Sequence, residues 1–100
     1  MASVGGVVSR ASRMRTKLQS ALEAIVLEIE DVSHQHASHA AMKDSNAQET
    51  HFNVKIVSPK FHGQTLLKRH RMVYAALSDE LHSGLHALSI VAKTPDEQSS

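Results

Sequence analysis

The sequence predicts an α+β domain in the order α-β-β-α-α-β, with a mixed three-stranded sheet and helices packed on it. Three observations lead to this prediction. Apolar residues recur at helical spacing near the start and again after Gly63, three short segments alternate apolar and polar residues, and the last of these follows a helical stretch. A strand reached through a helical crossover can pair parallel to its neighbour. Because 100 residues match the usual size of a single domain, we expect one domain over 10–95, with tails at 1–9 and 96–100.

The first helix is predicted at about 10–24, where apolar side chains recur every three to four positions. Ser9 and Ser12 are candidate N-caps, because their hydroxyls can accept the unpaired N–H groups of a first helical turn. Residues 26–32 then alternate between aliphatic and acidic or polar side chains. That alternation predicts a strand with one face in water.

A polar stretch, 33–50, separates this strand from the next. It shows no sustained periodicity and is longer than most loops in compact domains, as functional or disordered loops often are. Residues 51–58 alternate again, and Pro59 ends the strand because proline has no N–H to donate. We expect the two strands to form an antiparallel pair across the loop.

The second half of the chain is predicted to contain two helices and the last strand. A turn at Gly63 precedes a helix at about 64–77. A shorter helical turn at 78–83 ends at Gly84, a residue typical of helix termini. The alternating residues that follow, 87–92, predict the third strand.

Composition excludes several classes of function. The chain has no cysteine, so disulfides, thiolate catalysis and metal sites built from its own thiolates are excluded. No apolar run approaches the roughly 18–20 residues of a membrane span. Phosphate-binding glycine loops, nucleophile elbows and spaced carboxylate pairs are also missing. We therefore expect no enzyme, no small-molecule substrate and no membrane segment.

Eight histidines make imidazole the most prominent chemical group of the chain. Three lie together in the long polar stretch, at His34, His36 and His39. Neutral imidazole binds Zn, Fe, Cu and Ni, although this spacing alone favours a solvated, His-rich loop. His86 lies where the third strand begins, and a strand end holds a side chain more firmly than a loop does. Its parity with Leu88 favours a half-buried histidine at the edge of the core.

The remaining histidines give weaker signals. His70 lies on the apolar face of its predicted helix, so we expect a structural hydrogen bond there. His51, His62 and His82 follow no pattern.

A local basic surface is predicted from Lys60, Lys68, Arg69 and Arg71, beside a helix-turn-helix-like segment at 64–83. Such charge binds phosphates and is equally compatible with an acidic protein partner. A charged helix face is also commonly just solvated. The net charge of +1 is too small to indicate nucleic-acid binding by itself, and the chain has no G-x-x-G loop of the kind that KH modules use.

Several motifs, taken as a set, resemble those of the BolA family in its eukaryotic, organelle type. They are Phe61-His62-Gly63, Arg69-His70-Arg71, His86-Ala87-Leu88 and the Glu49-Thr50-His51-Phe52 run that leads into the second strand. The resemblance covers about 10–95 and implies a topology like that of class II KH domains. The start of the chain, MASVGGVVSRASRMR, contains Ser and Arg but no acid, as organelle transit peptides do. We therefore expect a chloroplast or mitochondrial protein, with a frayed tail as the alternative interpretation of this stretch.

Proteins of the BolA family pair with monothiol glutaredoxins and share a 2Fe–2S cluster with them. The partner supplies a cysteine and a glutathione thiolate, and the BolA protein supplies a histidine from the terminal strand and a Cys or His from the long loop. Carried over to this chain, the resemblance implies His86 as one ligand and His36 as the other, with His34 and His39 as alternatives. Mixed histidine and thiolate ligation also occurs in Rieske centres, where it tunes the cluster potential.

The resemblance thus implies a non-enzymatic iron–sulfur adaptor that acts in cluster assembly, cluster transfer or iron and redox regulation. Some relatives have been linked to transcriptional control, so a nucleic-acid-binding regulator using Lys68, Arg69 and Arg71 is the alternative. A stand-alone zinc or copper site through the loop histidines is a third possibility.

Overall fold

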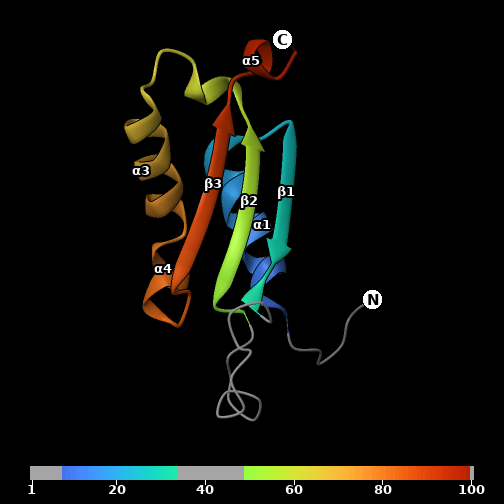
Figure 1. Ribbon diagram of the computed structural model, residues 1–100, viewed down its shortest axis with the longest axis vertical. Helices are drawn as coiled ribbons and strands as arrows, with labels where there is room; N and C mark the ends of the chain where they lie inside the picture. Colours follow the sequence, from blue (N-terminus) through green and yellow to red (C-terminus); the bar gives the residue numbers. More distant parts are fainter. Residues whose placement is uncertain (1–7, 34–48, 100) are drawn as a thin grey trace.

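The computed structural model describes residues 8–33 and 49–99 (Figure 1). Its elements are, in order, α1 (Arg10–Leu22), β1 (Val26–Asp31), β2 (His51–Val57), the short 3-10 helix η2 (Pro59–Phe61), α3 (Leu66–Ala76), α4 (Ser78–His82), β3 (Ala87–Lys93) and α5 (Pro95–Ser99). The predicted α+β class and the order of the six main elements are confirmed. Within the described ranges, no helix has the length and apolar character needed to cross a bilayer.

The three strands form one mixed sheet in the order β1-β2-β3. β1 runs antiparallel to β2, with Val26 opposite Val57, and β3 runs parallel to β2, with His51 opposite Ala87. Both predicted pairings are confirmed. Because β2 and β3 are parallel and in register over their whole length, the first residues of the two strands lie at the same end of the sheet.

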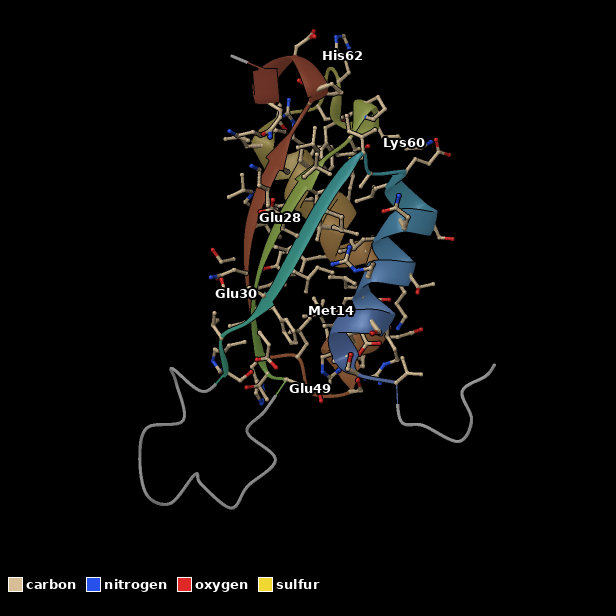
Figure 2. All side chains as sticks on the ribbon, turned by 90° about the vertical axis from the view of Figure 1, so that its right-hand side faces the viewer. Met14, Glu28, Glu30, Glu49, Lys60 and His62 are labelled. Carbon is tan, nitrogen blue, oxygen red and sulfur yellow. The ribbon has the colours of Figure 1, made fainter. Side chains whose placement is uncertain are left out.

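The helices α1 and α3 cover one face of the sheet, and no element of the described ranges covers the other face (Figures 1 and 2). Alternate residues of β2 point toward the helices, and Phe52, Val54 and Ile56 are at most 2% exposed. They pack with apolar residues of α1, η2, α3 and the α3–α4 junction, among them Met14, Leu18, Phe61, Val73 and Leu77. Burying side chains of this size stabilises a fold by about 1.5–3 kcal/mol each, so this layer holds the helices on the sheet.

The helix ends follow from local capping. Ser9 is the N-cap of α1, because its hydroxyl accepts the N–H of Ser12. The helix ends before the predicted position because Glu23 adopts a left-handed conformation with a φ of 49°. α3 begins two residues later than predicted, after the N-cap Thr65.

The end of the chain differs from the expected tail at 96–100. Thr94 and Glu97 form a reciprocal cap, in which the Thr94 N–H donates to the Glu97 carboxylate at 2.9 Å and the Glu97 N–H donates to the Thr94 hydroxyl at 3.2 Å. This is a capping box, with proline in the first helical position. The chain therefore continues as α5 beyond the boundary that was expected at 95.

Candidate functional site

His86 lies between α4 and β3 and is exposed to solvent. Its N–H donates to the Thr50 carbonyl at 2.8 Å, and the next N–H, of Ala87, donates to the same carbonyl at 3.1 Å. Leu85, one residue earlier, is buried at 2% exposure. The half-buried position expected from strand parity is therefore wrong: His86 precedes the strand, and Leu85 occupies the core position. The backbone is held while the imidazole remains accessible.

A second imidazole lies next to His86. His51, the first residue of β2, has its ring centroid 6.4 Å from that of His86, with the ring planes tilted by 54°. Its Nδ1 is 2.8 Å from the Thr50 hydroxyl. No role for His51 was predicted, because its nearness to His86 appears only when β2 and β3 are paired parallel in register. Two histidines that are 35 positions apart along the chain thus meet at one end of the sheet.

The long polar stretch begins and ends at this same end of the sheet. Ser33 is 2% exposed, and its hydroxyl accepts the N–H groups of Thr50 at 2.8 Å and His51 at 3.0 Å. The Val32 N–H donates to the His51 carbonyl at 2.9 Å. Glu49, labelled in Figure 2, lies at this end, and His62 lies at the opposite end. Ser33 therefore closes the base of the connection between β1 and β2.

The predicted ligands His34, His36 and His39 lie in 34–48, outside the described residues. Among the residues that are described, no group of three or more His, Cys, Asp or Glu side chains is arranged to hold a metal ion. The described part of the site therefore consists of the exposed His86, the adjacent His51 and the anchored base of the connection.

A buried ion cluster lies beneath the turn that leads to His86. The Glu80 carboxylate is 2% exposed and accepts from Arg10 at 2.6 Å, Arg13 at 2.9 Å and Lys17 at 2.6 Å. The hydrogen bond from Arg13 is the main cause that lowers the pKa of Glu80 to about 2. The same bond raises the pKa of Arg13. All three cations lie on α1, so the cluster joins α1 to α4.

The predicted basic surface is only partly present. Lys60, Lys68 and Arg71 are exposed, and the ammonium of Lys60 is 3.9 Å from the carboxylate of Glu23. Within the described structure, neither Lys68 nor Arg71 forms a salt bridge.

Arg69 does not belong to that surface, and its predicted role as a surface cation is wrong. It is 7% exposed and donates to the carbonyls of Gln64 at 2.9 Å and Ala92 at 3.0 Å. It also pairs with Glu97 of α5 at 2.7 Å, and this hydrogen bond is the main cause that lowers the pKa of Glu97 to about 2. Arg69 is engaged inside the fold because α5, which was not predicted, supplies the carboxylate.

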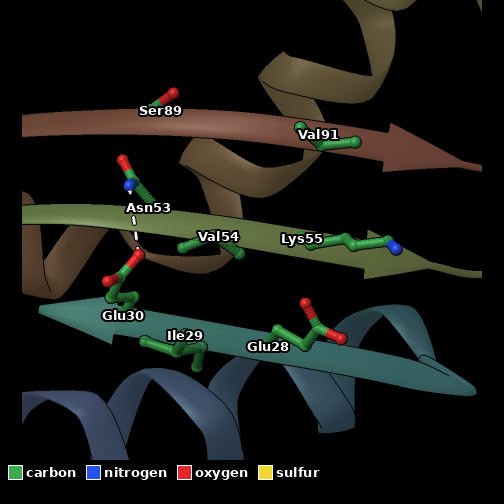
Figure 3. A pocket seen from close by; sticks show the side chains of 8 residues that line it. All are labelled: Glu28, Ile29, Glu30, Asn53, Val54, Lys55, Ser89 and Val91. Carbon is green, nitrogen blue, oxygen red and sulfur yellow. Dashed lines mark hydrogen bonds between the residues drawn. The ribbon is translucent and has the colours of Figure 1, made fainter.

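The open face of the sheet contains a shallow depression (Figure 3). Its lining side chains are mostly polar and come from all three strands: Glu28, Glu30, Asn53, Lys55, Ser89 and Val91, with Ile29 and Val54 beneath. The amide of Asn53 donates to Glu30 at 3.3 Å. None of these side chains is an imidazole, but a neighbouring depression that shares Asn53 and Ser89 with this one is lined by His51.

Comparison with known proteins matches this architecture to one family. The sequence profile described as BolA-like protein matches residues 18–97. The chain is 62% identical over 96 residues to Protein BOLA1, chloroplastic, of Arabidopsis thaliana. The aligned region covers 96% of this chain and 60% of that protein. It is 59% identical over 91 residues to SufE-like protein 1, chloroplastic/mitochondrial, of the same plant, which covers 89% of this chain and 24% of that protein. The chain thus spans less than two thirds of the length of these two relatives.

A bacterial relative and a solved structure extend the match. The DNA-binding transcriptional regulator BolA of Escherichia coli is 38% identical over 85 residues, covering 85% of this chain and 75% of that protein. The structure of BolA1 from Arabidopsis thaliana superposes with a TM-score of 0.83 at 63% identity, covering 92% of this chain and 98% of that one. The fold is therefore one that related proteins share.

Proposed function

The chain belongs to the BolA-like protein family, and from this premise we propose that it is a non-enzymatic adaptor that binds a monothiol glutaredoxin and holds a 2Fe–2S cluster jointly with it. Family membership supports a BolA-type role; the glutaredoxin, the cluster and the absence of a catalytic step are our proposal. One observation supports it most: the exposed imidazole of His86 stands on a hydrogen-bonded backbone at the end of the sheet where the His-rich connection is anchored.

The donor groups of this chain fit one half of a mixed ligand set. The ring centroids of His86 and His51 are 6.4 Å apart, and the chain has no cysteine. Iron–sulfur clusters are held mainly by thiolates, and histidine replaces part of the thiolate set in some of them. A chain with an exposed imidazole at His86 and no thiol suits a site whose sulfur donors come from a partner.

In this proposal the chain presents His86 and keeps the surrounding backbone fixed. The two N–H groups at 86 and 87 are bonded to Thr50, so the imidazole is offered without a change in the strand. His36 provides the second nitrogen, with His34 and His39 as the alternatives. When bound, the cluster would supply one-electron chemistry or be passed on to a recipient protein.

We also propose that the protein works in the chloroplast or the mitochondrion. The two Arabidopsis relatives are named chloroplastic and chloroplastic/mitochondrial. Import of a fluorescent fusion of the full-length protein into isolated organelles tests this assignment.

The ligand role of His86 is tested with a glutaredoxin loaded with cluster and glutathione. On mixing, we expect the heterodimer of the unchanged chain to show visible absorption and circular dichroism that differ from those of the glutaredoxin alone. We expect His86→Ala to abolish that difference. The matched control is His62→Ala, an exposed histidine at the opposite end of the sheet, which leaves the spectrum unchanged. An unaltered spectrum with His86→Ala would exclude His86 as a ligand.

The same measurement identifies the second ligand. We expect His36→Ala to change the spectrum as His86→Ala does, while His34→Ala and His39→Ala leave it unchanged. Because His51 lies beside His86, His51→Ala is measured as well. If His51→Ala abolishes the spectral difference and none of the three loop variants does, His51 replaces His36 as the second ligand.

A nucleic-acid-binding regulator is the second candidate. It is favoured by the exposed cations Lys68 and Arg71 on α3, which lack salt bridges in the described structure, and by the name of the Escherichia coli relative. The buried position of Arg69 counts against it, because this cation is neutralised by Glu97.

Titration with a short DNA duplex at low salt tests this second function. We expect binding that weakens steeply as salt is added, and Arg71→Ala to weaken it and to lower the salt slope by about 1. Lys55→Ala, which removes a cation from the open face of the sheet, serves as the control and leaves binding unchanged. No binding by the unchanged chain at low salt would exclude the function.

A further inference from the structure

We propose that Arg10 is a positioning residue, which holds the turn that carries His86 against the start of β2 and so sets the relation between the His86 and His51 imidazoles. Its relevance to a bound cluster rests on the function proposed above. The contacts of Arg10 that support this role are all with described residues, and they are present in the chain without a cluster.

The guanidinium of Arg10 reaches the last turn of α4. Its side chain is 11% exposed. Nη1 donates to the Glu80 carboxylate at 2.6 Å, the Ser83 hydroxyl at 2.8 Å and the Glu80 carbonyl at 3.2 Å, and Nη2 donates to the Ser83 carbonyl at 3.2 Å. The Glu80 carbonyl also accepts the N–H of Leu85 at 2.9 Å. Arg10 therefore hydrogen-bonds to the backbone just before His86.

The backbone of Arg10 is bonded to the segment that leads into β2. Its N–H donates to the carboxylate of Glu49 at 2.7 Å, and Glu49 holds a left-handed conformation with a φ of 67°. The next residue, Thr50, accepts the N–H of His86. The two segments are thus joined twice, once directly through Thr50 and once through Arg10.

Gly84 shows how close Arg10 lies to this turn. A Cβ at Gly84 would come within 3.1 Å of Arg10 Nη2, and the φ of +132° at this position suits glycine alone. A side chain here would push the guanidinium away from the turn.

The other two cations on Glu80 do not make this connection. Arg13 and Lys17 bind the Glu80 carboxylate, and among the hydrogen bonds of the described residues neither donates to Ser83 or Glu49. Arg10 differs from the other two cations because it is in the first position of α1. Its N–H has no partner within the helix and can donate to a group outside it. A planar guanidinium can also serve several acceptors in a fixed fork, which an ammonium cannot.

The test compares Arg10→Lys with Arg13→Lys in the isolated, cluster-free chain. Both changes keep the charge and remove one guanidinium from Glu80, so a merely structural role predicts the same response to both. We expect Arg10→Lys to shift the amide resonances at 49–51 and 85–87, and to accelerate hydrogen exchange of the His86 and Ala87 amides by about tenfold relative to the core amide of Val54. Arg13→Lys leaves these local ratios unchanged.

Two additional measurements make the outcome decisive. If Arg10→Lys does not fold, Glu49→Ala, which removes the acceptor of the Arg10 N–H, must loosen the same amides. Equal responses to Arg10→Lys and Arg13→Lys, or no response to Glu49→Ala, would overturn the positioning role. With cluster-loaded glutaredoxin, Arg10→Lys is expected to alter the visible circular dichroism and Arg13→Lys to leave it unchanged. If the unchanged chain takes up no cluster while the amide result holds, the proposed function fails and the positioning role stands.

Discussion

Two arginines of one motif, Arg69 and Arg71, have opposite roles in this protein. Residues two apart on a helix lie about 200° apart around its axis, so they face opposite sides. Arg69 points inward to Ala92 and Glu97, and Arg71 points to solvent. Grouping the cations by their nearness along the chain, as the sequence prediction did, combined two faces of α3. The helical period alone would have separated them.

This difference predicts unequal effects on stability. We expect Arg69→Ala to lower the free energy of unfolding by about 2–3 kcal/mol, because it leaves the carbonyls of Gln64 and Ala92 without their donor and removes the partner of Glu97. Arg71→Ala is expected to change it by less than about 0.5 kcal/mol. Urea unfolding followed by circular dichroism measures both. Equal losses would contradict the assignment of Arg69 to the interior.

The histidines show how far sequence reasoning reaches at this scale. His86 could be named only by resemblance, since strand parity placed it at the core edge. His51 was missed because its neighbour is distant along the chain and no periodicity links the two. His36 stays a prediction. A side chain that acts through tertiary pairing leaves no local signal, whereas a motif shared with a family does.

Among the elements, α1 and α4 are joined by charge. Two of the three cations on Glu80, Arg10 and Arg13, come from the stretch at the start of the chain that resembled a transit peptide, and Lys17 follows it. Nothing in the linear order of charges indicates that a carboxylate more than 60 positions later gathers them. Their ion pairs with a buried carboxylate make them part of the folded domain.

We expect Glu80→Gln to destabilise the protein by about 3 kcal/mol. The change removes the negative charge and leaves Arg10, Arg13 and Lys17 close together, and breaking a buried pair by removing one partner is strongly destabilising. Glu28→Gln on the open, exposed face is the control and is expected to stay within about 0.5 kcal/mol. Midpoints of urea unfolding for the three chains decide the matter, and similar midpoints would show that the cluster contributes little.

The elements themselves were largely predictable. Alternation identified all three strands, and the helical crossover gave the parallel pairing. The start of α1 at Ser9 was predicted, whereas the end of α1 and the start of α3 shifted by two residues, because the backbone at Glu23 and capping by Thr65 set them. α5 was missed although Thr94 and Glu97 have the spacing of a capping box. That motif was the available signal.

At the scale of the whole molecule, two carboxylates link folding to pH. Glu80 and Glu97 have their pKa lowered from 4.5 to about 2 by hydrogen bonds from cations. Below pH 5 the unfolded carboxyls take up protons while the folded ones stay ionised, so falling pH favours the unfolded state. The stabilisation is therefore complete above pH 5 and is lost as the pH falls toward 2.

We expect the free energy of unfolding to decrease steadily from pH 5 to pH 2. In Glu80→Gln this decrease is expected to be shallower, because one of the two linked carboxylates is absent. Urea unfolding at half-unit pH intervals measures both curves. Parallel curves would show that Glu80 does not contribute to the acid sensitivity.

The hydroxyl of Ser33 has a consequence for how this protein can change over time. By completing the backbone bonds of Thr50 and His51, it ends the sheet before the polar connection starts. Changes in the length or the composition of that connection then need not alter the strands. The sheet can therefore stay constant while the sequence of the connection changes.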